Sequence, residues 1–519
     1  MNHSFVLSLD YRNIGVLFSL NTLNIFLNVV VSTLTVYIFG TTPKVEAFFA
    51  ASLLGTAVSR FVNTGQLVEI VVSRYHRTKQ EVSKQAAMSI IATLCNYMTG
   101  IALLLTLVFI ASGTGIINLL VPGFQEDTKW SIWQIYCITG FLMPIQIATN
   151  LFQGLLNAEN IYGKVEITNT VSLVLNVLIL AIWGNPNSVA SLVAGLVISV
   201  LAQFLTILYY LRQIGYQHSW LTRNPYFPLR DLARTLSATS TYMISVQIYI
   251  FLFNAALSLL PPGSFAIYRY AEIIYGKVAS VFMLPISTVF FNEINRLLHQ
   301  NNGQSIKAFV SKNLNFSFFI GFMIMLPFWA GGNYLLWTFW GGAKFNEHDV
   351  TAVYELLCIF FLSMIWSGPY MIFRKLAVTV GRPELLYYYW SVTHVVSAAI
   401  GYALIHTLGF RGVMIQVFVH NFLMSLVPIL AVRLGKRTHF GFYEPKEIFK
   451  ITLALLGGIG VIWGIKSYWA EMAAYTKLES FLVGAFLAIL SSLVFVGGNL
   501  LLKVHDINLI SSKILNRIK

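Results

Sequence analysis

The chain has 519 residues, of which 57% are hydrophobic and only 10% are charged, and its formal net charge is +14. A soluble domain carries about 25% charged residues, so this composition leaves too little polar surface to cover a water-soluble globule. The mean hydropathy of +0.71 excludes a soluble class in the same way.

Long stretches without Asp, Glu, Lys or Arg indicate repeated membrane crossing. A membrane-spanning helix needs about 20 mostly apolar residues, and residues 167–211 are long enough for two, with Gly184-Asn185-Pro186-Asn187 as the turn between them. The uncharged stretches are residues 85–125, 167–211, 235–268 and 480–502.

Apolar runs between turn and charge clusters predict an all-α polytopic membrane protein with about fourteen transmembrane helices. The second of these is interrupted by Arg60, Asn63, Gln66 and Glu69, so it should face protein or a water-filled cavity rather than lipid. In chain order the expected spans are near 14–39, 46–72, 86–112, 131–156, 163–184, 187–211, 236–260, 264–292, 313–340, 352–373, 385–408, 412–432, 451–466 and 480–502.

The distribution of basic residues predicts the orientation. Even-numbered loops and the C-terminal tail hold 24 of the 34 Lys and Arg, whereas odd-numbered connections hold six. By the positive-inside rule we expect both termini to lie in the cytoplasm. The basic loops then face anionic lipids, which explains the net charge without a nucleic-acid partner. We see no removable signal peptide.

A weak internal repeat, with matching residues 221 positions apart, predicts two related halves. Each copy falls between the third and fourth helix of a six-helix half, and such repeats are typical of transporters. We therefore expect a six-helix lobe at 1–215, a second at 216–440, and two extra helices with a cytoplasmic tail at 441–519. The matched residues are Phe124, Glu126, Cys137 and Phe152 with Phe345, Glu347, Cys358 and Phe373.

No cofactor or metal site is expected. The three cysteines, Cys95, Cys137 and Cys358, lie in apolar segments and lack the spacing of metal ligands. We expect a monomer that has membrane lipids as partners.

Several motifs, in order along the chain, resemble the MurJ/MviN family. They are Tyr37-Ile-Phe-Gly-Thr-Thr-Pro-Lys-Val-Glu-Ala-Phe-Phe-Ala-Ala51, Leu120-Val-Pro-Gly-Phe124, Pro144, Gly154-Leu-Leu-Asn-Ala158, Gln247, Asn254, Leu260-Pro-Pro-Gly263, Tyr270-Ala-Glu272 and Pro285. The resemblance implies the multidrug/oligosaccharidyl-lipid/polysaccharide exporter superfamily. It also implies flipping of undecaprenyl-pyrophosphate-linked saccharides across the bacterial inner membrane by alternating access, with no enzymatic step. The lipid-linked oligosaccharide is then the expected substrate, and polysaccharide-assembly proteins are further candidate partners.

Departures from the family's arginines bear on the substrate. The arginine positions of the first helix appear here as Ile25 and Val31, and the pair of the second helix is reduced to Ser59-Arg60. In the eighth helix, the family has an acidic residue followed by arginine, and this chain has Glu272 followed by Ile273. Arg269 lies one turn before Ile273 on the same face of the helix. We therefore favour a surface-glycan or exopolysaccharide unit over the peptidoglycan precursor.

Three cations inside predicted spans are candidate phosphate ligands: Arg60, Arg269 and Lys277. Placing a Lys or Arg inside a spanning helix costs roughly 2.5–3.5 kcal/mol on insertion scales, so each calls for an explanation. Our hypothesis is that all three converge on a diphosphate, with Glu272 holding Arg269 in its absence. The alternative is that Lys277 snorkels to an interface and Arg269 only pairs with Glu272.

Polar residues on two helices are candidate sugar ligands. The first helix carries a stripe at helical spacing that either bonds neighbouring helices or lines a cavity. Gln247 and Asn254, seven residues apart, share a face of the seventh helix. The stripe is Asn21, Asn24, Asn28, Ser32 and Thr35.

Three other functions compete: an enzyme on the same lipid carrier, a multidrug exporter, and a family member that has lost arginines and acts as a scaffold for polysaccharide assembly. A glycosyltransferase or polymerase on the same carrier needs acid–base residues in an external loop, and the acids there are chiefly Glu126-Asp127 and Glu347-His348-Asp349, at repeat-equivalent positions. A cation-coupled multidrug exporter of the superfamily needs an acid inside the first or seventh helix, and neither expected span has one.

Overall fold

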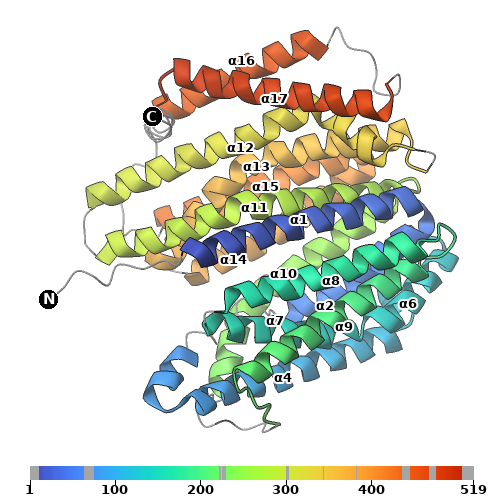
Figure 1. The fold of residues 1–519 in the computed structure, drawn as a ribbon, viewed down its shortest axis with the longest axis vertical. Coiled ribbons are helices and arrows are strands. Elements are labelled where there is room, and N and C mark those ends of the chain that lie inside the picture. Colours follow the sequence, from blue (N-terminus) through green and yellow to red (C-terminus); the bar gives the residue numbers. More distant parts are fainter. Residues whose placement is uncertain are drawn as a thin grey trace. The chain divides into compact units, whose positions relative to one another are not determined.

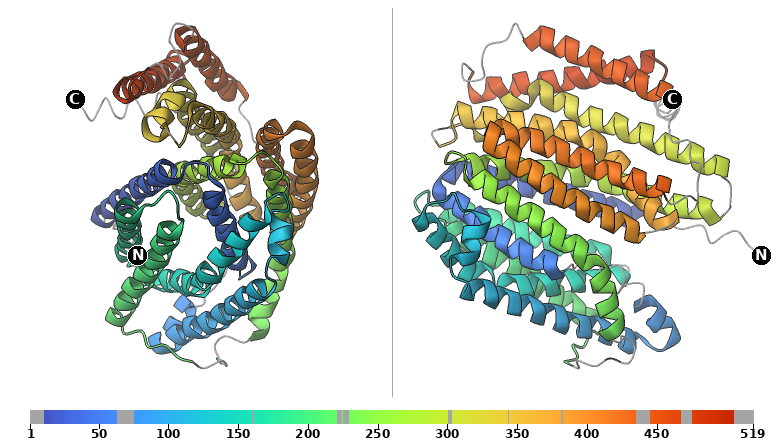
Figure 2. Two further views of the ribbon diagram at one scale, coloured as in Figure 1. Left: turned by 90° about the vertical axis from the view of Figure 1, so that its right-hand side faces the viewer. Right: turned by 180° about the vertical axis from the view of Figure 1, so that it is seen from behind.

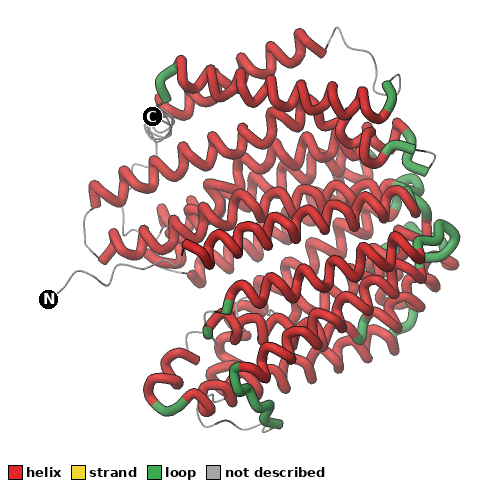
Figure 3. Tube along the Cα trace, in the orientation of Figure 1, coloured by secondary structure: helices red, strands yellow, loops and turns green. Residues whose placement is uncertain are grey.

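The computed structural model describes residues 11–62, 75–159, 161–220, 224, 229–299, 303–342, 344–380, 383–434, 445–466 and 475–504. Helices dominate these residues, and no β-strand occurs among them (Figure 3). The expectation of an all-α polytopic fold is thereby confirmed.

Figure 1 shows the helices in chain order. Those up to residue 258 are α1 (Tyr11–Phe39), α2 (Pro43–Val62), α4 (Lys84–Ala111), α5 (Gly115–Leu120), α6 (Glu126–Thr139), α7 (Leu142–Ala158), α8 (Tyr162–Trp183), α9 (Ala190–Gln213) and α10 (Leu229–Ser258). The rest are α11 (Ser264–His299), α12 (Gly303–Trp340), α13 (Glu347–Val380), α14 (Pro383–Leu408), α15 (Phe410–Leu434), α16 (Pro445–Lys466) and α17 (Lys477–Leu501).

Eleven described helices are long and apolar enough to cross a membrane, and α6 with α7 adds a twelfth if the pair counts as one span. The predicted count of fourteen is therefore approximate. Two predicted spans, near 46–72 and 264–292, correspond to α2 and α11, which are not among these candidates. Part of the former, with Asn63, Gln66 and Glu69, lies outside the described residues, as does the C-terminal tail after residue 504.

The predicted span 131–156 is broken in the structure. Helices α6 and α7 meet at a bend of 46°. Pro144 stands in the first turn of α7 and has no N–H to continue a helical ladder from α6. A side chain at Gly140 would lie 2.8 Å from the Tyr136 carbonyl oxygen, so the break also needs a glycine.

The chain divides into two compact units. Unit 1 comprises Met1–Gln247 and Pro261–Ala266, and unit 2 comprises Ile248–Leu260 and Ile267–Lys519. Within unit 1, α8 packs against α1 and α9, α4 packs against α7, and α2 packs against α6. Within unit 2, α12 packs against α13, α16 and α17, and α15 packs against α13 and α14 (Figure 2). The predicted lobe boundaries stay a prediction.

The two acidic clusters each lie in the first turn of a helix. Glu126 opens α6 and pairs with Lys129 at 2.8 Å. Glu347 opens α13, where the Asn346 and Asp349 side chains each accept a hydrogen bond from the other residue's backbone N–H, at 3.0 and 3.2 Å. Carboxylates at a helix N-terminus satisfy unpaired N–H groups. Asn346 and Asp349 therefore cap the start of α13, and Glu126 forms an ion pair within the first turn of α6.

Candidate functional site

Unit 2 holds a buried cation between two polar side chains. Arg269 is only 7% exposed, and its guanidinium donates to the carboxylate of Glu272 and to Oδ1 of Asn254. The Glu272 side chain keeps 43% of its surface exposed, whereas Asn254 is 2% exposed. The predicted Arg269–Glu272 pair is present, and Asn254 is a partner that the sequence did not indicate.

Helix geometry explains why these three residues meet. Arg269 and Glu272 are three residues apart on α11 and so lie on one face. Asn254 stands one turn before the end of α10, and the turn that carries Leu260-Pro-Pro-Gly263 leads directly into α11. The last turn of α10 is thereby brought beside the first turns of α11. The guanidinium also lies over the Tyr268 ring, with its Cζ 5.2 Å from the ring centroid, a cation–π contact.

The beginning of α11 is anchored in unit 1 by a buried carboxylate. Oε1 of Glu46 accepts hydrogen bonds from the backbone N–H groups of Gly263, Phe265 and Ala266 at 3.0, 3.1 and 3.3 Å. These groups have no carbonyl partner in the first turn of a helix, and a negative charge there is favourable. Gly263 has φ +92°, a conformation that favours glycine.

Gln247 is the predicted site residue with the most unusual surroundings. It is buried in unit 1, and among the described residues neither its Nε2 nor its Oε1 finds a hydrogen-bond partner. Burying an amide without a partner is costly. An unsatisfied carboxamide of this kind is suited to a polar ligand.

The polar stripe of α1 bonds a neighbouring helix at its centre. Asn24 is buried and donates to Glu166 Oε2 at 3.0 Å, while Thr170 donates to Asn24 Oδ1 at 2.7 Å. Asn28 bonds the backbone of its own helix, and Asn21 is exposed. These bonds favour the packing interpretation for Asn24, and a cavity role for Asn21 and Asn28 stays a prediction.

Glu166 was not among the predicted site residues, since it lies in the fifth expected span rather than in the first or seventh. It lies near the start of the α8 span and joins a network that links α1, α7, α8 and α9. Asn169 donates to Glu166 at 3.2 Å and accepts from Gln153 and Gln203 at 3.1 and 2.6 Å. The available signal was the helical spacing of Glu166, Asn169 and Thr170, which places three polar side chains on one face of α8.

The remaining predicted cations are placed separately. Lys277 is half-buried on α11, two turns beyond Arg269, in unit 2. Arg60 is exposed in the last turn of α2, in unit 1. Their convergence with Arg269 on one phosphate group stays a prediction.

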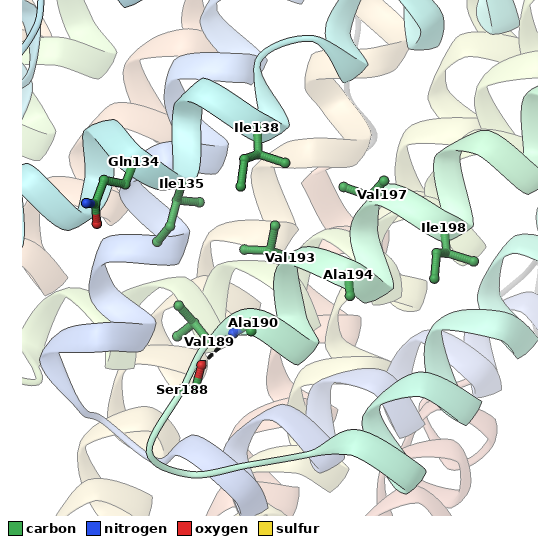
Figure 4. Close-up of a pocket in the computed structure, with 10 residues that line it drawn as sticks. All are labelled: Gln134, Ile135, Ile138, Ser188, Val189, Ala190, Val193, Ala194, Val197 and Ile198. Carbon is green, nitrogen blue, oxygen red and sulfur yellow. Dashed lines mark hydrogen bonds between the residues drawn. The ribbon is translucent and has the colours of Figure 1, made fainter.

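A groove of about 520 Å³ in unit 1 contains none of the predicted site residues. Figure 4 shows its apolar walls, formed by Ile135 and Ile138 of α6 and by Val193 and Val197 of α9. It has no charged lining residue, so it is suited to hydrocarbon rather than to phosphate. In the described residues, no group of three or more His, Cys, Asp or Glu is arranged to hold a metal ion.

Comparisons with known proteins are consistent with this geometry. A family model described as "Lipid II flippase MurJ" matches residues 35–492. A solved structure titled lipid II flippase MurJ, inward closed conformation, has a TM-score of 0.73 and 17% identity, covering 92% of this chain and 98% of that one. No curated protein matches the chain.

Multidrug transporters have a related fold. An inward-facing multidrug resistance transporter of the MOP superfamily has a TM-score of 0.62 and 15% identity, covering 79% of this chain and 94% of that one. A MOP transporter from Pyrococcus furiosus has a TM-score of 0.56 and 16% identity, with 81% and 94% covered. At such identities the structural likeness shows the fold alone.

Proposed function

Because the chain belongs to the lipid II flippase MurJ family, as the model matching residues 35–492 shows, we propose that it flips a polyprenyl-diphosphate-linked saccharide across the bacterial inner membrane. Movement is by alternating access, without covalent chemistry. The observation that carries the proposal is the buried Arg269, held by one neutral and one acidic partner.

The unequal partners of Arg269 suit it to exchange an internal anion for a phosphate. Glu272 is partly exposed and can leave the guanidinium, whereas Asn254 is buried and keeps it oriented. A diphosphate that replaces Glu272 gains charge-assisted hydrogen bonds from a planar donor suited to phosphate oxygens. The phosphate then crosses the low-dielectric region partly neutralised, which lowers a cost of several kcal/mol for a lone charge.

Further ligands are proposed on the remaining polar residues. Arg60 and Lys277 supply additional positive charge to the diphosphate, and the free carboxamide of Gln247 bonds a sugar hydroxyl. In this scheme Asn21 and Asn28 of the α1 stripe are sugar ligands, while Asn24 positions the helix through α8.

The saccharide is proposed to be a surface-glycan or exopolysaccharide unit. A peptidoglycan precursor adds peptide carboxylates to the diphosphate and so calls for more cations. Arginine is absent at Ile25, Val31 and Ile273, and Arg269 is already half neutralised by Glu272. A neutral glycan fits this smaller positive charge.

The test is flipping of fluorescent undecaprenyl-diphosphate-linked saccharides in liposomes. Losing a charge-assisted hydrogen bond costs about 1.5–3 kcal/mol, so we expect Arg269→Ala to slow flipping roughly tenfold to a hundredfold. Arg269→Lys should retain part of the activity, because it keeps the positive charge but loses the planar guanidinium that can donate two parallel hydrogen bonds to a phosphate.

Arg77→Ala is the matched control, since Arg77 pairs with Glu81 on the exposed surface and its loss should leave the rate unchanged. Full activity in Arg269→Ala would refute the phosphate role of Arg269. Running a neutral glycan and a peptide-bearing precursor side by side decides between the two substrate classes.

A further inference from the structure

Two histidine rings lie next to each other inside unit 2. His394 of α14 is 5% exposed, and its ring centroid is 5.3 Å from that of His420 on α15. Tyr249 of α10 stacks on His420 with centroids 4.1 Å apart and planes within 14°. The stack fixes the orientation of the His420 ring and leaves its nitrogens to form hydrogen bonds in the ring plane.

A directional hydrogen-bond chain ends on His420. Gln416 Nε2 donates to Ser397 at both the carbonyl oxygen, 2.8 Å away, and Oγ, 2.9 Å away. Ser397 Oγ lies 2.9 Å from His420 Nδ1. An amide nitrogen only donates, so Ser397 Oγ accepts from Gln416 and keeps its own proton for the histidine. Neutral His420 therefore accepts at Nδ1.

Protonation of His420 reverses the last link of this chain. Nδ1 then becomes a donor, and the Ser397 hydroxyl rotates to accept from it. Ser397 and Gln416 are both fully buried, so the alternative arrangement is made within the protein. The network thus has two arrangements that differ by one proton.

The pair is suited to hold one proton and not two. Two imidazolium charges at this separation repel strongly in a low dielectric, so the first proton is shared and the second is disfavoured. Ionisable groups buried among spanning helices are costly and generally mark ion or proton pathways. An unperturbed histidine changes charge near neutral pH. Burial and the neighbouring ring favour the neutral form of this pair, so it stays unprotonated until a negative charge is placed nearby.

Other ionisable groups connect this pair to the phosphate site. Tyr249 stacks on His420 and also lies 5.7 Å, centroid to centroid, from His394. Tyr249 stacks on Phe253 of the same helix, with ring centroids 5.8 Å apart, and the Phe253 ring lies 4.9 Å from that of Tyr268. The Arg269 guanidinium lies over the Tyr268 ring, and Glu272 pairs with it, so these two charged groups stand at the other end of a chain of ring contacts. On α13, the Ser363 hydroxyl accepts a hydrogen bond from Nδ2 of Asn421 on α15 at 3.0 Å, and neither side chain carries a charge. While Glu272 neutralises Arg269, these groups add no net charge beside the histidines.

We propose that His394 and His420 form a proton-binding site that takes up one proton when a diphosphate displaces Glu272 from Arg269. The excess negative charge of the diphosphate stabilises the protonated pair, and by reciprocity the proton tightens phosphate binding. This inference rests on the proposed function and adds a coupling proton to it.

The direct experiment measures proton uptake. Undecaprenyl diphosphate is added to the full-length protein in weakly buffered detergent with a pH indicator, at constant sodium. We expect the wild type to take up about one proton near pH 7, and the His394→Gln/His420→Gln double variant to lose this uptake. His76→Gln is the control, because His76 is exposed and distant in sequence from the network; it should keep the uptake.

Ser397→Ala guards against a variant that fails only by misfolding. It keeps both rings and removes the hydrogen bond to His420, so the pH at which uptake is half-maximal should shift while the proton count stays the same. Equal uptake at every pH in the wild type and the double variant would overturn the inference.

A second measurement separates this inference from the proposed function. The flipping rate is measured as a function of pH. If the wild-type rate does not depend on pH, or if the double variant shows the same pH dependence, the proton site is refuted while the flippase proposal stands. If the wild type neither binds nor flips the lipid, the flippase proposal fails. Nitrogen-15 histidine titration without substrate then tests the site: one shared proton supports it, and two independent titrations refute it.

Discussion

Glu159 shows how one residue can join several segments of unit 1. It follows α7 directly, and its carboxylate accepts from the Tyr75 hydroxyl and from Lys79, each at 2.5 Å, with Lys84 at 3.5 Å. Burial raises the pKa of Glu159, but the hydrogen bonds from Lys79 and Tyr75 and the charge of Lys84 outweigh it, so the pKa lies below its ordinary value.

We predict that Glu159→Gln lowers the free energy of unfolding by about 2 kcal/mol at pH 7. Because the folded pKa is depressed, the carboxylate contributes its full stability above the ordinary value of about 4.3. That contribution is lost as the pH falls through the folded pKa. Thermal unfolding in detergent should therefore show a gap between wild type and variant at pH 7 that narrows below about pH 4.

Glu81→Gln is the control for this prediction, since Glu81 pairs only on the exposed surface. Its unfolding midpoint should match that of the wild type. Equal midpoints for Glu159→Gln and wild type at pH 7 would contradict the assignment.

At the residue scale, the sequence predicted what helical spacing controls. The Arg269–Glu272 pair follows from three residues on one helix, and the structure contains it. Asn254 was singled out as an inward polar residue, but its bond to Arg269 depends on the turn between α10 and α11. Glu166 and Glu46 drew no functional prediction, because their partners come from other helices.

At the element scale, close approach of helices depends on glycine. A Cβ at Gly331 of α12 would lie 2.1 Å from the carbonyl oxygen of Gly484 on α17. Small residues at a membrane helix contact let the two backbones approach and gain van der Waals packing. This contact joins one of the two C-terminal helices to the body of unit 2.

We predict that Gly331→Ala separates α12 from α17 and destabilises the protein by about 1–3 kcal/mol, the usual cost of overpacking. Gly457→Ala on α16 is the matched control, because nothing lies within 4 Å of its added Cβ. The measurement is the midpoint of thermal unfolding for both variants. An unchanged midpoint for Gly331→Ala would mean that the two helices do not depend on this contact.

Element boundaries were predicted well where the apolar run ends in a strong local signal. The expected span 86–112 corresponds to α4, which Ser83 caps by accepting from the Ala86 N–H at 3.1 Å. The expected span 131–156 was too simple, since Pro144 and Gly140 divide it. Proline position indicates a kink in a sequence, but the size of the bend depends on what the helices pack against.

At the scale of the whole molecule, the family model confirms the resemblance that the motifs indicated. The multi-pass membrane class is shown, whereas the side on which each loop lies is a prediction from charge alone.

We predict that impermeant maleimide labels Asn187→Cys from outside intact cells and does not label Arg77→Cys. Both positions are exposed, so a difference between them reports sidedness rather than burial. Cys95, Cys137 and Cys358 are first replaced by Ser or Ala. After permeabilisation both variants should react. Labelling of Arg77→Cys in intact cells would reverse the proposed orientation.

The sequence by itself determined the membrane class, the approximate number and limits of the spans, and the family. Apolar runs, turn residues and charge clusters are local signals, and each span forms its own backbone hydrogen bonds. Only the tertiary structure decided which polar groups meet. Glu46 and Gly263 are 217 residues apart, and Ser397 meets His420 across two helices. Such contacts depend on how helices pack, because the residue pattern of one helix does not specify which residues of another helix it will contact.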